Sequence, residues 1–390
     1  MSHGPNLPAN PFYDSPAQRV ALARQRFFED GLRPSGVVSE AVIQSWSRCL
    51  RTHPDPARAA VFEPVTPSRA HRVLRSNREL LEAAGAELER LRTTLAGTSC
   101  TAMLTDARGV IIGSSFTQGR SHERLMPITT RIGVNLAEEV VGTNAPGLTA
   151  RSGQPSVVLG DEHFFANVTV MHCAAAPIRN VRGQLAGVLD LSSEGLPFGF
   201  DAASVVAHYA AEIENRLLCA QSTEHLVARL QIAPALLDTP MAALVGITGD
   251  GRIDWLNGAA ARLLGLAAPL GQRPQASVEG SLGVPLATLI AMSIDSAPQM
   301  LHLPNGLALW GRCEWRSRDG HRRLHAAEPS PPRPAPAAPP QAPQPATLRA
   351  TGRQTVVRVL EECGGNVSKA AQTLGVSRGL IYRHLRQRDA

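Results

Sequence analysis

Residues 356–387 read VVRVLEECGGNVSKAAQTLGVSRGLIYRHLRQ, and this stretch gives the clearest prediction of structure in the chain. Apolar residues spaced three and four apart predict a first helix, which the Gly364-Gly365 pair ends. Asn366 suits the N-cap of a second helix, in which Ala370 and Ala371 are small enough to let another helix cross closely. The stretch therefore predicts a small module of short, closely packed helices.

The third helix of this module carries the charge. Leu374-Gly375-Val376 predicts a tight turn before it, and Ser377 is its expected N-cap. Ile381 and Leu385, four residues apart, share the inward face. The side chains expected to point outward are those of Arg378, Tyr382, Arg383 and Arg386. An exposed arginine-bearing helix after a tight turn predicts a helix-turn-helix, whose second helix enters the major groove by its amino end.

The charge distribution favours double-stranded DNA as the partner of this module. Residues 347–390 hold eight basic and three acidic side chains, so +5 of the net charge of +6 lies there. We expect base-edge contacts from Ser377, Arg378 and Arg383, and phosphate contacts from Tyr382 and Arg386. The predicted DNA-binding set is completed by Gly379 and Leu380. The affinity should then fall with added salt.

A proline-rich segment separates this module from the rest of the chain. PSPPRPAPAAPPQAPQP, residues 329–345, contains nine prolines and favours extended polyproline geometry. We expect a semi-rigid linker over 329–346 and a DNA-binding domain over 347–390. Because so short a module makes a small core, a homodimer is expected.

The first half of the chain predicts an antiparallel α+β domain. Thr66-Pro67 begins an amphipathic helix that ends near Gly97, and Asn135 with Glu138 resembles a capped short helix. Strands are expected at residues 101–106, 110–113, 156–159, 168–179 and 184–191. The predicted fold class is therefore α+β, with a helical region over 1–75 and a sensor-like domain over 76–221.

A second, smaller sheet is expected before the linker. Asp201 caps a predicted helix that continues to about Gln231, whose apolar stripe is either a dimer seam or a face lying on the sheet. Residues 243–254 repeat the strand, turn, strand pattern of the first domain, and Asn257 begins a helix. Residues 267–327 are weakly patterned, and the second domain is expected over 222–328.

Several kinds of chemistry are not predicted. No Gly-Lys dipeptide occurs, so the chain holds no P-loop for ATP, and the Gly375–Gly379 match to a hydrolase elbow follows helical pattern where a strand is required. The six cysteines are scattered and are expected to be reduced thiols, without a metal or a cofactor. Neither a signal peptide nor a long apolar run is found, so a cytoplasmic protein without membrane contact is expected.

The polar cluster in the first domain has metal-ligand residue types but no standard metal spacing. It comprises Asp161, Glu162, His163, His172 and Cys173. His172 and Cys173 are neighbours on a predicted strand and would point to opposite faces. Packing, hydrogen bonding or ligand contact is the favoured interpretation, with a metal or redox sensor as the alternative.

Two stretches resemble a known family. GGNVSKAAQTLGVSRGLIYRHL resembles the Fis-type helix-turn-helix, and SWSRC, EEVVGTNAPG, GDEHF and CAAAPIRNVRGQLAGVLDLS resemble the GAF sensor domain of bacterial acetoin-catabolism-regulator-type activators. Residues 232–265 are similar to the short PAS-like segment of those regulators. The resemblance implies a nucleoid-associated bacterial regulator of transcription that senses a small-molecule effector. The sensor residues it implies are Thr143, Asn144, His163 and Cys173, each with a role in the core as the alternative. His172 of the polar cluster is added to them as a fifth candidate for ligand contact.

The departures from that family limit what the chain is expected to do. The family places an AAA+ ATPase between the sensor and the DNA-binding module, where this chain has its proline-rich segment. A threonine is common in the family where Leu380 stands, so the family's base contact is not expected at this position, and a methyl contact to thymine is the alternative. The leading hypothesis is thus a ligand-responsive DNA-binding regulator that acts without ATP and is not an enzyme.

Two alternatives remain open. An adaptor or anti-activator would pair with a full-length, ATPase-bearing relative and bind DNA poorly alone. A GAF-type thiol oxidoreductase would need Cys100 and Cys173 within about 7 Å between Cα atoms.

Overall fold

The computed structural model describes residues 15–34, 36–117, 123–266, 271–295, 297–316, 355–356 and 358–386. The chain divides into two compact units, Met1–Ala220 and Gln221–Ala390. The predicted linker over 329–346 lies outside the described residues. Each unit is built on one antiparallel five-stranded sheet, so the α+β class is confirmed.

Four helices open the first unit. They are α1 (Pro16–Phe28), α2 (Glu40–Thr52), α3 (Pro67–Ser76) and α4 (Arg78–Leu95). The single helix predicted from Thr66 to Gly97 is wrong in one respect, because it breaks at Asn77. The Asn77 side-chain amide donates to the Val73 carbonyl at 2.8 Å, a local bond that competes with continued helix. Thr66 stands at the N-cap without a side-chain capping bond.

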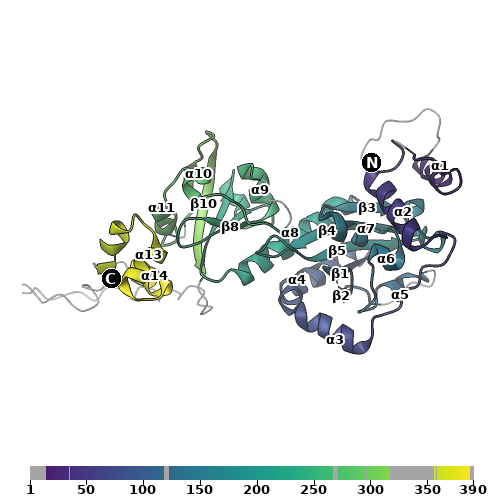
Figure 1. Ribbon diagram of the computed structural model, residues 1–390, viewed down its shortest axis with the longest axis horizontal. Helices are drawn as coiled ribbons and strands as arrows, with labels where there is room; N and C mark the ends of the chain where they lie inside the picture. Colours follow the sequence, from purple (N-terminus) through teal and green to yellow (C-terminus); the bar gives the residue numbers. More distant parts are fainter. Residues whose placement is uncertain are drawn as a thin grey trace, which may run out of the picture. The chain divides into compact units, whose positions relative to one another are not determined.

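The first sheet has the strand order β2-β1-β5-β4-β3 (Figure 1). Its strands are β1 (Cys100–Asp106), β2 (Ile111–Ser114), β3 (Ser156–Leu159), β4 (Met171–Arg179) and β5 (Leu185–Glu194). The β1–β2 turn needs Gly109, which has φ +83° and whose added Cβ would lie 2.8 Å from the Ala137 nitrogen. All five predicted strands are present, with ends shifted by a few residues.

Short helices and one long helix complete the first unit. They are α5 (Met126–Thr129), α6 (Glu138–Val141), α7 (Ala145–Ser152) and α8 (Ala202–Gln221), with 3-10 turns at Gly160–Glu162 and Ala166–Val168. Asn135 does not cap α6, since Ala137 occupies the cap position and Asn135 Oδ1 accepts from the Ala137 N–H.

The apolar stripe of α8 lies on the first sheet. Val206, Ala210, Ile213 and Leu217 are buried in one cluster with apolar residues of α4, β1, β4 and β5. Of the two interpretations of the stripe, a dimer seam or a face lying on the sheet, the structure shows the face lying on the sheet. The helix ends at Gln221, and the predicted continuation to Gln231 is wrong because β6 (His225–Gln231) pairs with two neighbouring strands.

The second unit contains a sheet of order β8-β7-β6-β10-β9. Its other strands are β7 (Ala243–Ile247), β8 (Ile253–Leu256), β9 (Gln299–His302) and β10 (Ala308–Arg316), and its helices before the linker are α9 (Gly258–Leu264), α10 (Val278–Leu282) and α11 (Leu286–Met292). A 3-10 turn, Pro234–Leu236, follows β6. Asn257 caps α9 as expected, accepting from the Ala260 N–H at 2.8 Å. The weakly patterned stretch thus supplies two strands and two helices.

The carboxyl-terminal module is helical. Residues 355–356 and 358–362 are helical, followed by α13 (Val367–Leu374) and α14 (Arg378–Arg386). Asn366 Oδ1 accepts from the Lys369 N–H at 3.0 Å, and Ser377 Oγ accepts from the Leu380 N–H at 3.3 Å. Both predicted caps are therefore confirmed. No helix among the described ranges is long and apolar enough to cross a membrane.

Candidate functional site

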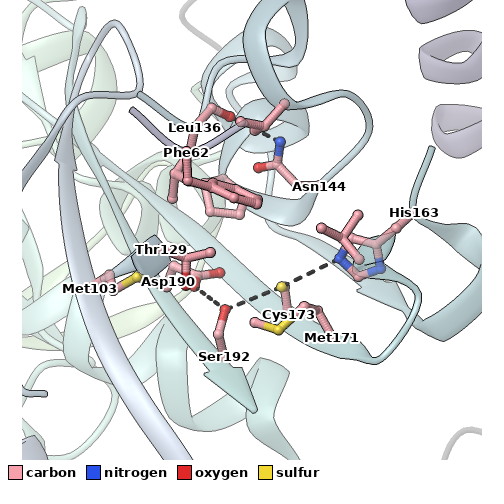
Figure 2. Close-up of a pocket in the computed structure, with 13 residues that line it drawn as sticks. Phe62, Met103, Thr129, Leu136, Asn144, His163, Met171, Cys173, Asp190 and Ser192 are labelled. Carbon is pink, nitrogen blue, oxygen red and sulfur yellow. Dashed lines mark hydrogen bonds between the residues drawn. The ribbon is translucent and has the colours of Figure 1, made fainter. Parts of the chain in front are cut away.

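The first unit encloses a mostly apolar cavity of about 40 Å³ (Figure 2). A cavity of this size admits a few waters or one small ligand. Its lining comes from the segment between α2 and α3, from β1, β4 and β5, from the loop after β3 and from the segments around α5 to α7. The lining residues are Phe62, Met103, Thr129, Leu136, Val141, Asn144, Pro146, His163, Val168, Met171, Cys173, Asp190 and Ser192.

A chain of polar side chains runs along one wall of the cavity. Figure 2 shows Cys173 between Ser192 and His163, with Ser192 also bonded to Asp190. The distances are 3.5 Å from Cys173 Sγ to His163 Nε2, 3.1 Å from Ser192 Oγ to Cys173 Sγ, and 2.6 Å from Ser192 Oγ to Asp190 Oδ2. Ser192 has one hydroxyl proton, so it donates to only one of its two partners at a time.

Burial disfavours the charged forms of His163 and Asp190, the two ends of this row of hydrogen-bonded side chains. It lowers the pKa of His163 to about 4, and it raises the pKa of Asp190 to about 7 against the opposing hydrogen bond from Ser192. His163 Nδ1 lies 2.9 Å from the Gly160 carbonyl, which fixes the proton on that nitrogen and leaves Nε2 as an acceptor for the Cys173 thiol. Burial also raises the pKa of Cys173 well above that of a free thiol. A thiol, not a thiolate, lies in this wall.

Two polar atoms in the lining have no hydrogen-bond partner in the part of the chain that the structure describes. Asp190 Oδ1 and Thr129 Oγ1 are buried without a hydrogen bond among the described residues. A buried polar atom without a partner is costly, so each favours a polar group inside the cavity. Thr129, Asp190 and Ser192 are cavity residues that the sequence analysis does not predict. The available signal was the two-residue spacing of Asp190 and Ser192 in VLDLS, which puts both on one face of β5.

The predicted sensor residues divide into two groups. Asn144, His163 and Cys173 line the cavity, but the polar atoms of Asn144 are used by the Gly147 N–H and the carbonyls of Leu136 and Gly142. Thr143 and His172 do not line it, because they point elsewhere. Thr143 Oγ1 lies 2.7 Å from Ser45 Oγ, and the His172 ring lies 6.5 Å from the Phe198 ring.

The N-terminal helices hold the loop that carries His163. Arg24 on α1 donates to the His163 carbonyl at 2.6 Å and to the Phe164 carbonyl at 2.7 Å. Trp46 on α2 donates to the Glu162 carbonyl at 2.8 Å. Ser45 donates to Glu138, and Arg48 pairs with the same carboxylate. The SWSRC and EEVVGTNAPG stretches therefore contact each other and position the rim of the cavity.

The two cysteines required for a thiol oxidoreductase cannot meet in this fold. Cys100 on β1 pairs with Ser193 of β5, whereas Cys173 on β4 pairs with Ser192 on the other side of β5. Two strand spacings of about 4.8 Å separate them, and adjacent residues of β5 face opposite sides of the sheet. This distance exceeds the reach of a disulfide. Within the described ranges, no group of three or more His, Cys, Asp or Glu side chains could hold a metal ion.

The helix-turn-helix forms the second candidate site. Gly375 has φ +63° in the turn between α13 and α14, where the Val376 N–H donates to the Ala371 carbonyl at 3.0 Å. Ala370, Ala371 and Ile381 are buried between the helices. Ser377, Gly379 and Leu380 lie in the first turn of α14, the part that enters the major groove in a helix-turn-helix.

Two side chains predicted to contact DNA instead contact other residues of the second unit. Arg378 Nη2 lies 2.7 Å from the Glu224 carboxylate, and the Tyr382 ring stacks on Trp315 with centroids 3.6 Å apart. Tyr382 is 3% exposed, so the prediction of an exposed tyrosine is wrong in this arrangement. The side chains of Arg383, Leu385 and Arg386 lie outside the described residues.

Comparison with known families matches two segments of the chain. Residues 15–200 match the N-terminal domain of MimR, and residues 347–387 match the bacterial regulatory protein, Fis family. Residues 201–346, between the matches, leave no room for an AAA+ domain.

Curated relatives are similar over part of their length. The acetoin catabolism regulatory protein of Cupriavidus necator is 31% identical over 254 residues, 63% of this chain and 37% of the relative. The propane 2-monooxygenase operon transcriptional activator MimR of Mycolicibacterium smegmatis is 28% identical over 171 residues, 44% of this chain and 28% of the relative. The acetoin dehydrogenase operon transcriptional activator AcoR of Bacillus subtilis is 28% identical over 207 residues, which cover 51% of this chain and 33% of the relative. The chain thus spans about a third of the length of these relatives.

Among solved structures, the E. coli DhaR(N)–DhaL complex is similar with a TM-score of 0.43. The identity is 18%, over 70% of this chain and 99% of the matched chain.

Proposed function

Because this chain joins the N-terminal domain of MimR/AcoR-type regulators to a Fis-type helix-turn-helix, we propose that it is a ligand-responsive regulator of transcription. It binds operator DNA through α14 and senses a small effector in the cavity of the first unit. The observation that carries the DNA part is the capped pair α13 and α14, with the Gly375 turn between them and Arg378 in the first turn of α14. The protein is a regulator rather than an enzyme.

The DNA contacts follow from the position of each residue on α14. Ser377, Arg378 and Arg383 read base edges, Leu380 contacts a thymine methyl, and Gly379 allows close approach of the backbone. Arg386 contacts phosphate, and Tyr382 can contact phosphate only after its ring separates from Trp315. Two such helices in a homodimer would contact half-sites spaced by one turn of the duplex.

The DNA proposal is tested by selecting bound sequences from a random duplex library with the full chain. Arg378→Ala and Arg383→Ala should each weaken binding to the selected duplex by about 1–3 kcal/mol and relax the preference at one position. Arg358→Ala is the matched control, because Arg358 is an exposed arginine of the same module that pairs with Glu362. If both α14 variants keep the affinity and preference of the unaltered chain, the DNA assignment is wrong.

The effector is a small, uncharged molecule that carries oxygen. The described lining contains no Arg or Lys to attract an anion, and its buried His163 is neutral. Asp190 Oδ1 and Thr129 Oγ1 require a hydrogen-bonding partner, while the remaining wall is apolar. Hydroxyketones fit this chemistry, and two of the similar regulators are named for acetoin, a hydroxyketone.

Thermal unfolding of the full chain with added acetoin, acetone or 2,3-butanediol tests the sensor. A ligand at 100 times its dissociation constant should stabilise the chain by about 2.7 kcal/mol. Asp190→Asn and Ser192→Ala should reduce that gain, whereas His172→Ala, on the opposite face of β4, should not. Equal loss of the gain in His172→Ala and Asp190→Asn would contradict the assignment of the cavity.

The domain assignment belongs to the same proposal. We infer a GAF-like sensor over 76–221 with its helical N-terminal region over 1–75, a PAS-like domain over 222–328, a linker over 329–346 and the DNA-binding domain over 347–390. Because the matched segments leave no room between them for an AAA+ domain, we infer that the chain does not itself hydrolyse ATP. We also infer that it acts in the bacterial cytoplasm. Co-purification with an ATPase-bearing relative, together with no DNA binding alone, would instead support the adaptor.

A further inference from the structure

The helix-turn-helix docks on the second sheet through three kinds of contact. The Gly249 carbonyl in the β7–β8 turn accepts from the Val367 N–H at 3.1 Å and the Ser368 N–H at 3.4 Å, at the start of α13. Arg378 forms its ion pair with Glu224, and Tyr382 stacks on Trp315 at an interplanar angle of 24°. We call this set of contacts the docking seam.

The apolar part of the docking seam is continuous with the core of the second unit. One buried cluster contains residues of the helix-turn-helix, such as Val367 and Ile381, together with residues of the sheet and of α11. A small helical module buries little apolar surface by itself, so this added burial stabilises it. The sheet therefore provides the module with a packing partner within the same chain.

The docking seam uses the residues that DNA would need. Arg378 is the predicted base-reading arginine at the start of α14, and a bidentate contact to guanine uses two guanidinium N–H groups, at least one of them on a terminal nitrogen. In the docked arrangement Nη2 bonds Glu224 and Nη1 bonds Ser368 Oγ at 3.3 Å. Tyr382 is covered by Trp315. Docking and DNA reading are therefore mutually exclusive at Arg378.

The backbone is strained at Glu224, the residue whose carboxylate pairs with Arg378. Glu224 has φ 60°, the single positive φ of a non-glycine residue among the described residues. Such a conformation is unfavourable for a residue with a Cβ and persists where the surroundings impose it. Glu224 lies in the turn between α8 and β6, and its carboxylate meets Arg378 there. Strain at a contact that engages a functional side chain is typical of a switch position.

Other features suit a contact that opens. Trp315 Nε1 and the Tyr382 hydroxyl are both buried without a hydrogen bond among the described residues. Burying these two donors without hydrogen bonds costs free energy, which opposes docking. When the module is released, both groups can bond to water, and this offsets part of the free energy lost with the other contacts. The Arg378–Glu224 pair is more than a third exposed on each side, so water and salt reach it.

We propose that the second sheet holds the helix-turn-helix in an autoinhibited arrangement, in which Glu224 competes with DNA for Arg378. This proposal rests on the DNA-binding function proposed above. It gives the PAS-like sheet the role of an internal ligand for the recognition helix. DNA binds only the released module, so every contact of the docking seam lowers the apparent affinity for DNA.

The test compares two matched carboxylates in the full chain. Glu224→Gln removes the charge that pairs with Arg378, whereas Glu314→Gln removes a charge on β10 that pairs with Arg316. DNA affinity is measured with the duplex selected by the unaltered chain, and hydrogen–deuterium exchange over residues 378–386 is measured without DNA. Glu224→Gln should bind the duplex about two- to fivefold more tightly and exchange faster over α14, since a partly exposed ion pair contributes modestly. Glu314→Gln should match the unaltered chain in both.

A second variant tests the docking seam through shape rather than charge. A Cβ at residue 249 would lie 2.8 Å from Ser368 Oγ and 3.4 Å from Arg378 Cδ, so Gly249→Ala should push α13 away and raise DNA affinity. In an Arg378→Ala background, Glu224→Gln should no longer change the affinity, because the competitor has lost its target.

The outcomes separate this proposal from the proposed function. If the chain binds DNA but Glu224→Gln leaves both affinity and exchange unchanged, or if Glu314→Gln has the same effect, autoinhibition is wrong and the DNA function stands. If no duplex binds any variant, yet Glu224→Gln and Gly249→Ala speed exchange over α14, docking stands and the DNA function is wrong.

Discussion

Arg48 of α2 and Glu138 of α6 form a two-pronged ion pair at the rim of the cavity. Nε lies 2.9 Å from Oε2, and Nη2 lies 2.8 Å from Oε1. The Glu138 side chain is 4% exposed, whereas that of Arg48 is 24% exposed. This pair joins the N-terminal helices to the segment that leads into α7, so the helical region belongs structurally to the sensor.

Arg48→Ala should destabilise the first unit strongly. The substitution leaves the Glu138 carboxylate buried beside Ser45 without its cation, and breaking a buried ion pair costs about 3–5 kcal/mol. We expect the lower end of that range, because Arg48 is partly exposed. Urea unfolding followed by tryptophan fluorescence measures the change in the free energy of unfolding.

Arg78→Ala is the control for this prediction. Arg78 pairs with Glu82 on the surface of α4, where the two side chains are 80% and 62% exposed. Exposed pairs contribute about 0–1 kcal/mol. A loss of similar size in both variants would show that the Arg48–Glu138 pair has no special structural role.

Asp190 and His163 should give opposite pH dependence of stability. The pKa of Asp190 is raised from 3.8 to about 7 by burial, so between these values the folded chain keeps a proton that the unfolded chain has lost. Stability from this group therefore falls as the pH rises. The pKa of His163 is lowered from 6.5 to about 4, so the unfolded chain binds the extra proton and stability rises with pH.

The difference in stability between each variant and the unaltered chain gives the pH dependence contributed by the group that was removed. The stability of Asp190→Asn relative to the unaltered chain should increase from pH 4 to pH 7, and that of His163→Gln should decrease from pH 4 to pH 6.5. Chemical unfolding at a series of pH values gives both differences. Parallel curves for the unaltered chain and Asp190→Asn would show that Asp190 ionises normally.

Local patterns predict much of the fold. Caps at Asn257, Asn366 and Ser377 are short-range signals, and each forms the hydrogen bond expected of it. His172 and Cys173 face opposite sides of β4 as strand alternation requires, and Cys173 lines the cavity. Features that depend on a few neighbouring residues are therefore predictable from the amino-acid sequence alone.

Features that depend on tertiary contacts are not predictable in this way. HLVARLQ, residues 225–231, suits a helix by spacing, but pairing with β7 and β10 makes it a strand. Spacing places Asp190 and Ser192 on one face of β5, but the role of Asp190 depends on its complete burial between β1 and β4, which local spacing does not predict. Likewise, Tyr382 is placed correctly on α14, yet Trp315 covers it from a strand 67 residues earlier.

Two glycine substitutions should have opposite effects on the first unit. Gly187 lies on β5 between β1 and β4, and an added Cβ would overlap the Thr105 carbonyl oxygen and lie 2.7 Å from a Leu80 methyl. Because the carbonyl belongs to the sheet backbone, it cannot move without disturbing the β1–β5 ladder. Gly187→Ala should destabilise the unit by about 1–3 kcal/mol.

Gly85 provides the matched case without a close neighbour. It lies inside α4, where an added Cβ meets no atom of the described residues within 4 Å. Alanine loses less backbone freedom on folding than glycine, so Gly85→Ala should stabilise the chain by about 0.5–1 kcal/mol. Denaturant midpoints of the two variants should therefore move in opposite directions from that of the unaltered chain. A shift of the same sign in both would mean that the close approach of β5 to the Thr105 carbonyl does not decide the outcome at Gly187.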